Sequence, residues 1–362
     1  MTEFRIKSHL PDIFRFRAGE ESRYPYLRLD KNERGDGYPE GLIREIRDRI
    51  SVDTINVYPE PEPLYIRLAE QSGLKKENFV LTTGADGAIK AAFEICDFAR
   101  GASVIRLEPT FAMVDIYCQI FGVHAKIVQY VARNQAPPEI EVDQILNALD
   151  DSVSLVVLAN PNSPTGTLIS REDILKIVKA AAAFGSLVLV DETYFDFSGA
   201  SVIDQVEEHS NLIVARSFSK GLGLAGLRIG YLAASKRTAR ACFAIKPMYE
   251  VNSISLLFAE ALLERPECVG DYVRAIDESR GLIQKLAASV GVGFLNSQAN
   301  FVYLETGEQT GRILEDAQAA GVLVRAGMGS AGYADWLRIS LIPARSMEPF
   351  MKILRARLGK EV

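Results

Sequence analysis

Short, largely apolar segments alternate with helical segments between about residues 79 and 235, and this alternation limits the possible folds more than any other feature. Strands that are covered on both faces are short and apolar at successive positions. Helical stretches such as REDILKIVKAAAAFG lie between several of the segments. The pattern therefore predicts an α/β fold with a mostly parallel central sheet. The segments that show it best are FVLTTG, SVIRLEPTF, SLVVLANPN, LVLVDETY and LIVARSFSK.

This sheet predicts a large domain over residues 30–264. Residues 1–29 are rich in charged and aromatic side chains and are expected to form an N-terminal arm. After about residue 265 the pattern changes to long amphipathic helices and a few strands, which predicts a smaller α+β domain over 265–362. Residues 30–49 could belong with that smaller domain instead.

Composition argues against several classes of protein. A net charge of −6 disfavours a nucleic-acid partner, because phosphate binding needs a basic surface. The 4 cysteines are widely spaced and only 3 histidines are present, so no metal site is expected. No apolar run reaches membrane-spanning length, and the N-terminus lacks a secretory signal. We therefore expect a soluble, cytoplasmic protein with no membrane contact.

Polar residues stand where the predicted strands end, and ligands bind at this edge of such sheets. In TTGADGAIK, the amides of Gly84, Ala85 and Asp86 open a helix and could bind a phosphate, although a simple capped turn would look the same. In NPNSPTG, Asn162 and Ser163 lie between prolines; the alternative here is a loop with Asx turns.

The next two strand ends carry ionisable side chains. Asp191 follows four apolar residues and should be buried, which is costly for a carboxylate unless a cation or a strong donor faces it. A helix cap is the alternative for Asp191. In SFSKGLGLAGLRIGY, serines and an arginine form a second phosphate-binding set beside a lysine; a surface lysine on a flexible loop is the alternative. The residues of this set are Ser217, Ser219, Lys220 and Arg228.

Taken together, these residues predict one pocket with a phosphate site, an aromatic ring from Phe111, a buried carboxylate, Tyr194 and a lysine. Pyridoxal 5′-phosphate needs this combination, since a lysine forms a Schiff base with its aldehyde and a carboxylate pairs with its ring nitrogen. The chain has no GxxxxGK[ST] motif, and no predicted strand leads into GxGxxG. ATP in a P-loop and a dinucleotide therefore lose support.

Several motifs resemble those of the fold type I, class I/II pyridoxal-phosphate aminotransferases, and the histidinol-phosphate aminotransferase family most closely. They are LDKNERGDG, VYPEPEP, NPNSPTG, VDETYFDF, SFSKGLGLAGLRIGY and the pair VRAG and WLRISL. The resemblance covers nearly the whole chain. It implies an enzyme that moves an amino group between a small amine or amino acid, phosphorylated or aromatic, and the 2-oxo acid 2-oxoglutarate.

The resemblance also implies roles for single residues. Lys220 would bond to the cofactor aldehyde and then act as general base and acid. Asp191 would hold the proton on the ring nitrogen, Tyr194 would contact the phenolate oxygen, and Phe111 would stack on the ring. The phosphate would be held by the turn at Gly84, Ala85 and Asp86, and by Ser217, Ser219 and Arg228.

The same resemblance predicts a homodimer with shared active sites, because Tyr58 would reach the phosphate of the other subunit. Arg338 would bind the substrate carboxylate or its equivalent, and Asn32 and Arg325 would line the substrate end. The family usually has asparagine where this chain has Ser163, so either Ser163 or Asn162 would contact the ring oxygen.

Two other functions stay open at this stage. A decarboxylase of a phosphorylated amino acid, such as threonine or serine phosphate, would use the same residues but hold the carboxylate out of the ring plane. A regulator that binds the cofactor without turnover usually carries a DNA-binding extension, for which an arm of residues 1–29 is too short.

Overall fold

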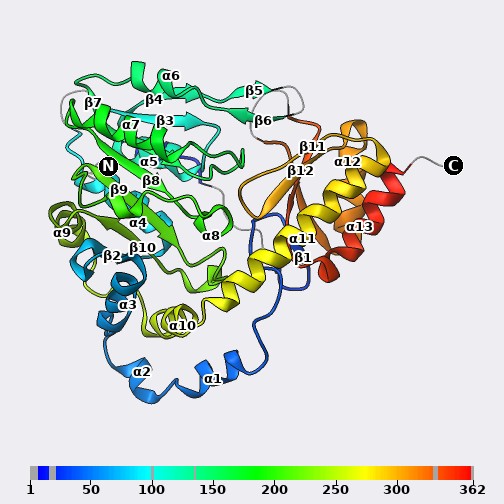
Figure 1. The fold of residues 1–362 in the computed structure, drawn as a ribbon, viewed down its shortest axis with the longest axis horizontal. Coiled ribbons are helices and arrows are strands. Elements are labelled where there is room, and N and C mark those ends of the chain that lie inside the picture. The colour runs from blue at the N-terminus through cyan, green and yellow to red at the C-terminus, as the bar shows by residue number, and fades with distance from the viewer. Residues whose placement is uncertain (1–6, 16–21, 99–101, 134–135, 329–332, 360–362) are drawn as a thin grey trace, which may run out of the picture.

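The computed structural model describes residues 7–15, 22–98, 102–133, 136–328 and 333–359. Its larger lobe is built around a seven-stranded sheet with the order β2-β10-β9-β8-β7-β3-β4 (Figure 1). β10 is antiparallel to both neighbours and the other adjacent pairs are parallel, which confirms the mostly parallel α/β sheet. The strands are β2 (Phe79–Thr82), β3 (Ser103–Glu108), β4 (His124–Gln129), β7 (Val153–Ala159), β8 (Leu187–Asp191), β9 (Leu212–Ser217) and β10 (Gly230–Ala234).

Helices cover both faces of this sheet, which explains why its strands are apolar at successive positions. Val188 and Val190 of β8 pack into one apolar cluster, and Leu189 packs into the other. One face is covered by α4 (Gly84–Ile95), α5 (Met113–Phe121) and α9 (Lys236–Ile245). The other is covered by α3 (Glu62–Ser72), α6 (Val142–Asn147), α7 (Arg171–Ala182) and α10 (Ser253–Leu263).

The smaller lobe contains a five-stranded sheet with the order β1-β13-β14-β12-β11. Its strands are β1 (Leu27–Leu29), β11 (Phe294–Leu295), β12 (Phe301–Glu305), β13 (Val322–Ala326) and β14 (Trp336–Ser340). It packs with α11 (Glu267–Val290), α12 (Thr310–Ala319) and α13 (Ala344–Leu358). Figure 1 shows α11 running from the larger lobe into the smaller one.

The start of the chain joins the smaller sheet, because β1 pairs in parallel with β13. The last residues of the predicted arm are therefore part of this sheet, while residues 1–6 and 16–21 of the arm lie outside the described residues. The domain boundaries stay a prediction. The remaining elements are α1 (Leu42–Asp48), α2 (Val52–Asn56), α8 (Phe195–Ser198), β5 (Val131–Arg133), β6 (Ala136–Glu139) and the 3₁₀ turns at 10–12, 76–78, 203–205, 225–227 and 307–309.

The strand ends that carry the polar motifs meet at one edge of the seven-stranded sheet. Asp191, the last residue of β8, pairs with Ala159 of β7 and Ala215 of β9. Gly230 begins β10 beside Ser217 and Thr82. Among the described helices, none is long and apolar enough to cross a membrane.

Gly230 provides a test of how tightly this edge is packed. A Cβ at position 230 would lie 2.6 Å from the carbonyl oxygen of Arg216 and 2.7 Å from the carbonyl carbon of Gly84, and backbone cannot move aside easily. We expect Gly230→Ala to lower the free energy of unfolding by about 1–3 kcal/mol, as overpacking does.

Urea unfolding measures this loss, and Gly281→Ala is the matched control. Gly281 lies inside α11 and a Cβ there would meet nothing within 4 Å. Gly281 is half-buried, and because a Cβ there has open space, replacing this helical glycine by alanine should leave stability unchanged or raise it by about 0.5–1 kcal/mol. A Gly230→Ala protein as stable as Gly281→Ala would contradict the packing argument.

Candidate active site

A cavity of about 310 Å³ opens at the edge of the large sheet where these strand ends meet. Its wall combines the ends of β8 and β9, the start of α4 and the segment that follows β1. The predicted site residues in the wall are Ala85, Asp86, Phe111, Ser163, Asp191, Tyr194, Ser217, Ser219, Lys220 and Arg228. The predicted residues that share this cavity are up to 143 positions apart in the sequence, from Ala85 to Arg228.

Asp191 brings a buried carboxylate to the cavity, with only 7% of the residue exposed. The amide and the hydroxyl of Thr193 both donate to Oδ1, at 3.0 and 2.6 Å. No hydrogen bond reaches Oδ2 from the described part of the chain. Burial raises the pKa of Asp191 to about 6, although the bonds from Thr193 lower it. Since α8 begins at Phe195 without a side-chain cap, Asp191 does not cap that helix.

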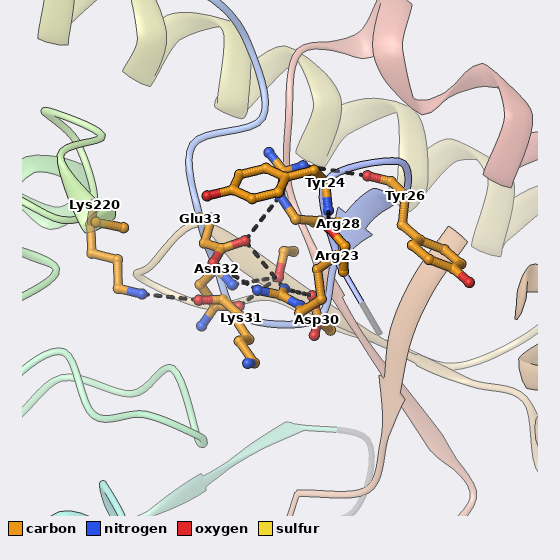
Figure 2. Close-up of polar contacts among 12 residues, drawn as sticks. Arg23, Tyr24, Tyr26, Arg28, Asp30, Lys31, Asn32, Glu33 and Lys220 are labelled. Carbon is orange, nitrogen blue, oxygen red and sulfur yellow. Dashed lines mark hydrogen bonds and ion pairs between the residues drawn. The ribbon is translucent and has the colours of Figure 1, made fainter. Parts of the chain in front are cut away.

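Lys220 lies in the turn after β9, and its side chain lines the same cavity. It is therefore not a surface lysine on an open loop. Its Nζ donates to the carbonyl oxygen of Lys31 at 3.0 Å, and Figure 2 shows the side chain pointing at that segment. The same Nζ lies 5.6 Å from the centre of the Tyr194 ring. The two ionisable groups on which the predicted chemistry depends, Asp191 and Lys220, therefore face one cavity.

Tyr194 is buried and receives a hydrogen bond from Asn32. Asn32 Nδ2 donates to the Tyr194 hydroxyl at 2.9 Å, and Asn32 Oδ1 accepts from Ser340 of β14 at 2.7 Å. Burial raises the pKa of Tyr194, but the Lys220 charge and the bond from Asn32 outweigh it and leave the pKa below its usual value. Asn32 thus reaches the site through Tyr194, although it is not part of the cavity wall.

The start of α4 brings together groups that could bind an anion. The amides of Ala85 and Asp86 are in the first turn of this helix and have no helical partner. Arg228 packs over Gly84, since a Cβ at Gly84 would lie 3.1 Å from its Nη2. The hydroxyl of Ser219 is buried and has no partner among the described residues. Unpaired donors, free amides and a guanidinium in one place suit a phosphate group.

The structure separates Asn162 from Ser163. Asn162 is fully buried, and its amide donates to the carbonyl of Pro109 at 3.0 Å and to Thr165 Oγ1 at 2.8 Å. Its Oδ1 accepts from Thr110 at 2.9 Å. With these bonds made, Asn162 holds its own loop and is not part of the cavity wall, whereas Ser163 is. The contact predicted for Asn162 therefore gains no support from the geometry.

Arg325 and Arg338 lie opposite each other on the antiparallel strands β13 and β14. Arg338 is buried; its Nη2 donates to the carbonyl of Asp30, while its Nε has no partner among the described residues. Arg325 is exposed. Like charges in directly opposite positions destabilise a sheet unless an anion lies between them. Neither arginine is in the wall of the 310 Å³ cavity.

Tyr58 lies away from this chain's own cavity. The residue is 71% exposed and its ring stacks on Tyr249, with ring centres 4.2 Å apart. Tyr249 is also exposed, as are several large apolar side chains close to Tyr58 or Tyr249 in the sequence: Val52, Ile55, Val57 and Met248.

Sequence reasoning missed Lys31, Glu33 and Thr193, which also line the cavity. Figure 2 shows Glu33 held by ion pairs with Arg23 and Arg28. Their position beside Asn32 and Asp191 in the motifs was a signal that could have identified them.

Comparison with known proteins adds the family context. Residues 26–356 match the profile of the family described as aminotransferase class I and II. Histidinol-phosphate aminotransferase 1 of Carboxydothermus hydrogenoformans is 34% identical over 87% of this chain and 88% of its own length. The histidinol-phosphate aminotransferase of Thermoanaerobacter sp. is 32% identical over 91% of this chain and 93% of its own.

A solved structure shows the same architecture. The histidinol-phosphate aminotransferase of Sinorhizobium meliloti, in complex with pyridoxal-5′-phosphate, superimposes with a TM-score of 0.83 at 25% identity. The alignment covers 98% of this chain and 99% of that one.

The raised pKa of Asp191 predicts a pH-dependent gain in stability for Asp191→Asn in protein freed of small molecules. The carboxyl group has a pKa of 3.8 when unperturbed and about 6 in the folded chain, so its ionisation opposes folding. The protonated carboxyl group makes its full contribution to the free energy of unfolding below pH 3.8, and this contribution is lost as the pH rises through about 6. We expect the asparagine variant to be more stable than the wild type by up to roughly 3 kcal/mol at pH 8, and by less at pH 5.

Unfolding by urea across this pH range measures the difference. Asp150→Asn is a control of opposite sign, because the hydrogen bond from Lys126 lowers the pKa of the Asp150 carboxyl to about 2. That substitution should give no gain at pH 8. If Asp191→Asn were less stable than the wild type at pH 8, burial would not be penalising the ionised Asp191 carboxylate.

Proposed function

The chain belongs to the class I and II aminotransferase family and is a pyridoxal-phosphate-dependent aminotransferase like histidinol-phosphate aminotransferase; from this premise we propose its substrates. The amino donor is a small phosphorylated or aromatic amine or amino acid, and the acceptor is 2-oxoglutarate. The observation that carries the proposal is the pair of opposed arginines, Arg325 and Arg338, in the sheet beyond the cavity.

The residues present fit pyridoxal phosphate. The unpartnered Ser219 hydroxyl, the free amides at the start of α4 and Arg228 suit its phosphate. Asp191 Oδ2 suits a protonated ring nitrogen. When bound, this cofactor supplies an aldehyde that joins to amines and a ring that accepts electrons from the substrate.

We assign the other predicted contacts with the cofactor to residues of the cavity wall. Lys220 is the residue that would join the aldehyde, Phe111 the one that would stack on the ring, and Tyr194 and Ser163 those that would contact its oxygen. All four line the cavity, which supports these assignments.

The chain's own groups divide the proton transfers between them. Lys220 Nζ takes the proton from the donor's α-carbon and later returns it, as a general base and acid does. Asp191 accepts a hydrogen bond on Oδ2 and keeps a positive charge opposite it; a facing cation also removes the cost of its burial. Tyr194, oriented by Asn32, donates its hydroxyl proton into the cavity.

The arginine pair would decide which substrates enter. A phosphate on the donor and the distal carboxylate of 2-oxoglutarate are both anions that a guanidinium binds through two parallel hydrogen bonds. Because donor and acceptor occupy the site in turn, one pair can serve both. Arg338 Nε, buried and unpartnered among the described residues, is a free donor for this purpose.

We also propose that two copies of the chain form a homodimer. Tyr58 and its apolar neighbours are exposed on one chain, as a subunit interface requires. In such a dimer Tyr58 would reach the phosphate site of the partner subunit.

Lys220→Ala tests the cofactor assignment. The wild-type protein should be yellow, and the variant should lose the band of the lysine-bound cofactor and its transaminase activity while remaining folded. Lys31→Ala is the matched control, because Lys31 is also a lysine of the cavity wall. It should keep the band. Absorption spectra and far-ultraviolet circular dichroism provide the measurements, and a Lys220→Ala protein with unchanged colour would refute the assignment.

Arg325→Met tests the substrate site. Loss of a charge-assisted hydrogen bond of about 1.5–3 kcal/mol should raise the KM for histidinol phosphate and for 2-oxoglutarate by about 10- to 100-fold. Arg312→Met is the control, because Arg312 is an exposed arginine on α12 and not on β13. This substitution should leave the KM for both substrates unchanged.

The assay should follow glutamate and carbon dioxide together over a panel of amines. Glutamate formation supports the transferase. Release of carbon dioxide without glutamate would contradict it and favour a decarboxylase.

A further inference from the structure

The turn that carries Lys220 is held by a side chain that is distant in the sequence. Gly223 N donates to the carbonyl oxygen of Lys220 at 3.1 Å, which closes the turn. Within it, the carbonyl oxygen of Gly221 accepts a hydrogen bond from Arg34 Nη1 at 3.1 Å. Arg34 belongs to the segment between β1 and α1, and not to the large sheet.

Tyr38 makes a second contact from the same segment. Its hydroxyl donates to the carbonyl oxygen of Leu222 at 2.6 Å. The three successive carbonyl groups of the turn therefore all have donors, and two of these donors come from residues 34–38. A Cβ at Gly223 would lie 2.5 Å from Arg34 Cδ and 2.8 Å from the Tyr38 hydroxyl, so the contact is close.

Arg34 is itself firmly fixed. Only 5% of its side chain is exposed, and it forms an ion pair with Asp36 at 2.7 Å. Its guanidinium lies 4.3 Å from the centre of the Tyr272 ring and donates to the carbonyl oxygen of Cys268 at 3.3 Å. Tyr272 and Cys268 belong to α11, the helix that runs between the lobes in Figure 1. Arg34 thus connects the Lys220 turn to α11.

The same segment also contacts the Lys220 amine. Nζ donates to the carbonyl oxygen of Lys31, three residues before Arg34 (Figure 2). Residues 31–38 therefore contact the backbone just after Lys220, through Arg34 and Tyr38, and the Lys220 amine, through the carbonyl group of Lys31.

We infer that Arg34 is a positioning residue for Lys220, with Tyr38 assisting it; this rests on the proposed role of Lys220. Proton transfer to and from carbon needs the amine within hydrogen-bond reach of the reacting atom, and a misplacement of about 1 Å can lower the rate by about 100-fold. Arg34 meets this need by fixing the turn, without touching the substrate.

Arg34→Met tests the inference in the cofactor-loaded enzyme. We expect kcat to fall by about 10- to 100-fold, while the KM of the amino donor stays within about twofold, because the substrate arginines are untouched. The visible circular dichroism per bound cofactor should also fall, by about twofold or more, because a loosened turn no longer holds the lysine-bound cofactor in one orientation.

Arg280→Met is the matched control. Arg280, which is part of α11, resembles Arg34 in being a largely buried arginine that donates to backbone carbonyls. Its partners are the carbonyl groups of Ser297 and Ala299, both at 2.7 Å, and not the Lys220 turn. It should lose thermal stability without changing the visible dichroism. Tyr38→Phe removes only one hydroxyl and should lower kcat and the dichroism in the same direction by a smaller factor, which keeps the test valid if Arg34→Met does not fold.

The outcomes separate the inference from the function. If the wild type shows its cofactor band and activity, and neither Arg34→Met nor Tyr38→Phe changes kcat or dichroism more than Arg280→Met does, the positioning role is overturned alone. A wild type without a cofactor band would overturn the proposed role of Lys220 and this inference together.

Discussion

The cavity contains a carboxylate at the end of a buried strand, and the burial of that group limits what can bind beside it. The apolar residues of β8 lie between two helical layers, and Asp191 ends that strand where water is largely excluded. Thr193 satisfies one of its oxygens, and burial raises the pKa of Asp191 to about 6. Such a group is unfavourable in isolation and favourable beside a cation. The position is therefore suited to a ligand with a protonated nitrogen, because such a ligand offsets the cost of burying the carboxylate.

The two lobes make different contributions to the proposed site. The larger lobe supplies the start of α4 and the lysine turn to the cavity wall, whereas the smaller sheet carries Arg325 and Arg338, to which we assign substrate binding. The segment between β1 and α1 joins these parts, since Asn32 contacts both Tyr194 of the large lobe and Ser340 of the small one. A change in how the lobes meet would consequently alter both the acidity of Tyr194 and the distance from the cofactor site to the arginines.

Much of the fold and of the site could be predicted because the relevant signals are local. Strands covered on both faces must be apolar at successive positions, and the carboxyl ends of parallel neighbours must share an edge. Asp191 and Lys220 follow from this reasoning without any knowledge of packing, whereas Arg228 precedes the antiparallel strand β10 and was predicted from its motif. Other features were beyond it. Whether Asn162 or Ser163 faces the cavity depends on a hydrogen bond that Asn162 donates to Thr165 and on one that it accepts from Thr110, and the second forms only when two loops pack together.

The sequence by itself determined the sheet, its polar edge and the type of cofactor, because periodicity and residue chemistry are read from neighbouring positions. Tertiary structure decided the rest. The pairing of β1 with β13 and the contact of Arg34 with the Lys220 turn join residues that are far apart in the chain, and the opposition of Arg325 and Arg338 depends on the register between two strands. Such contacts are set by how two sheets and α11 pack against one another, and no local pattern of residues encodes that arrangement.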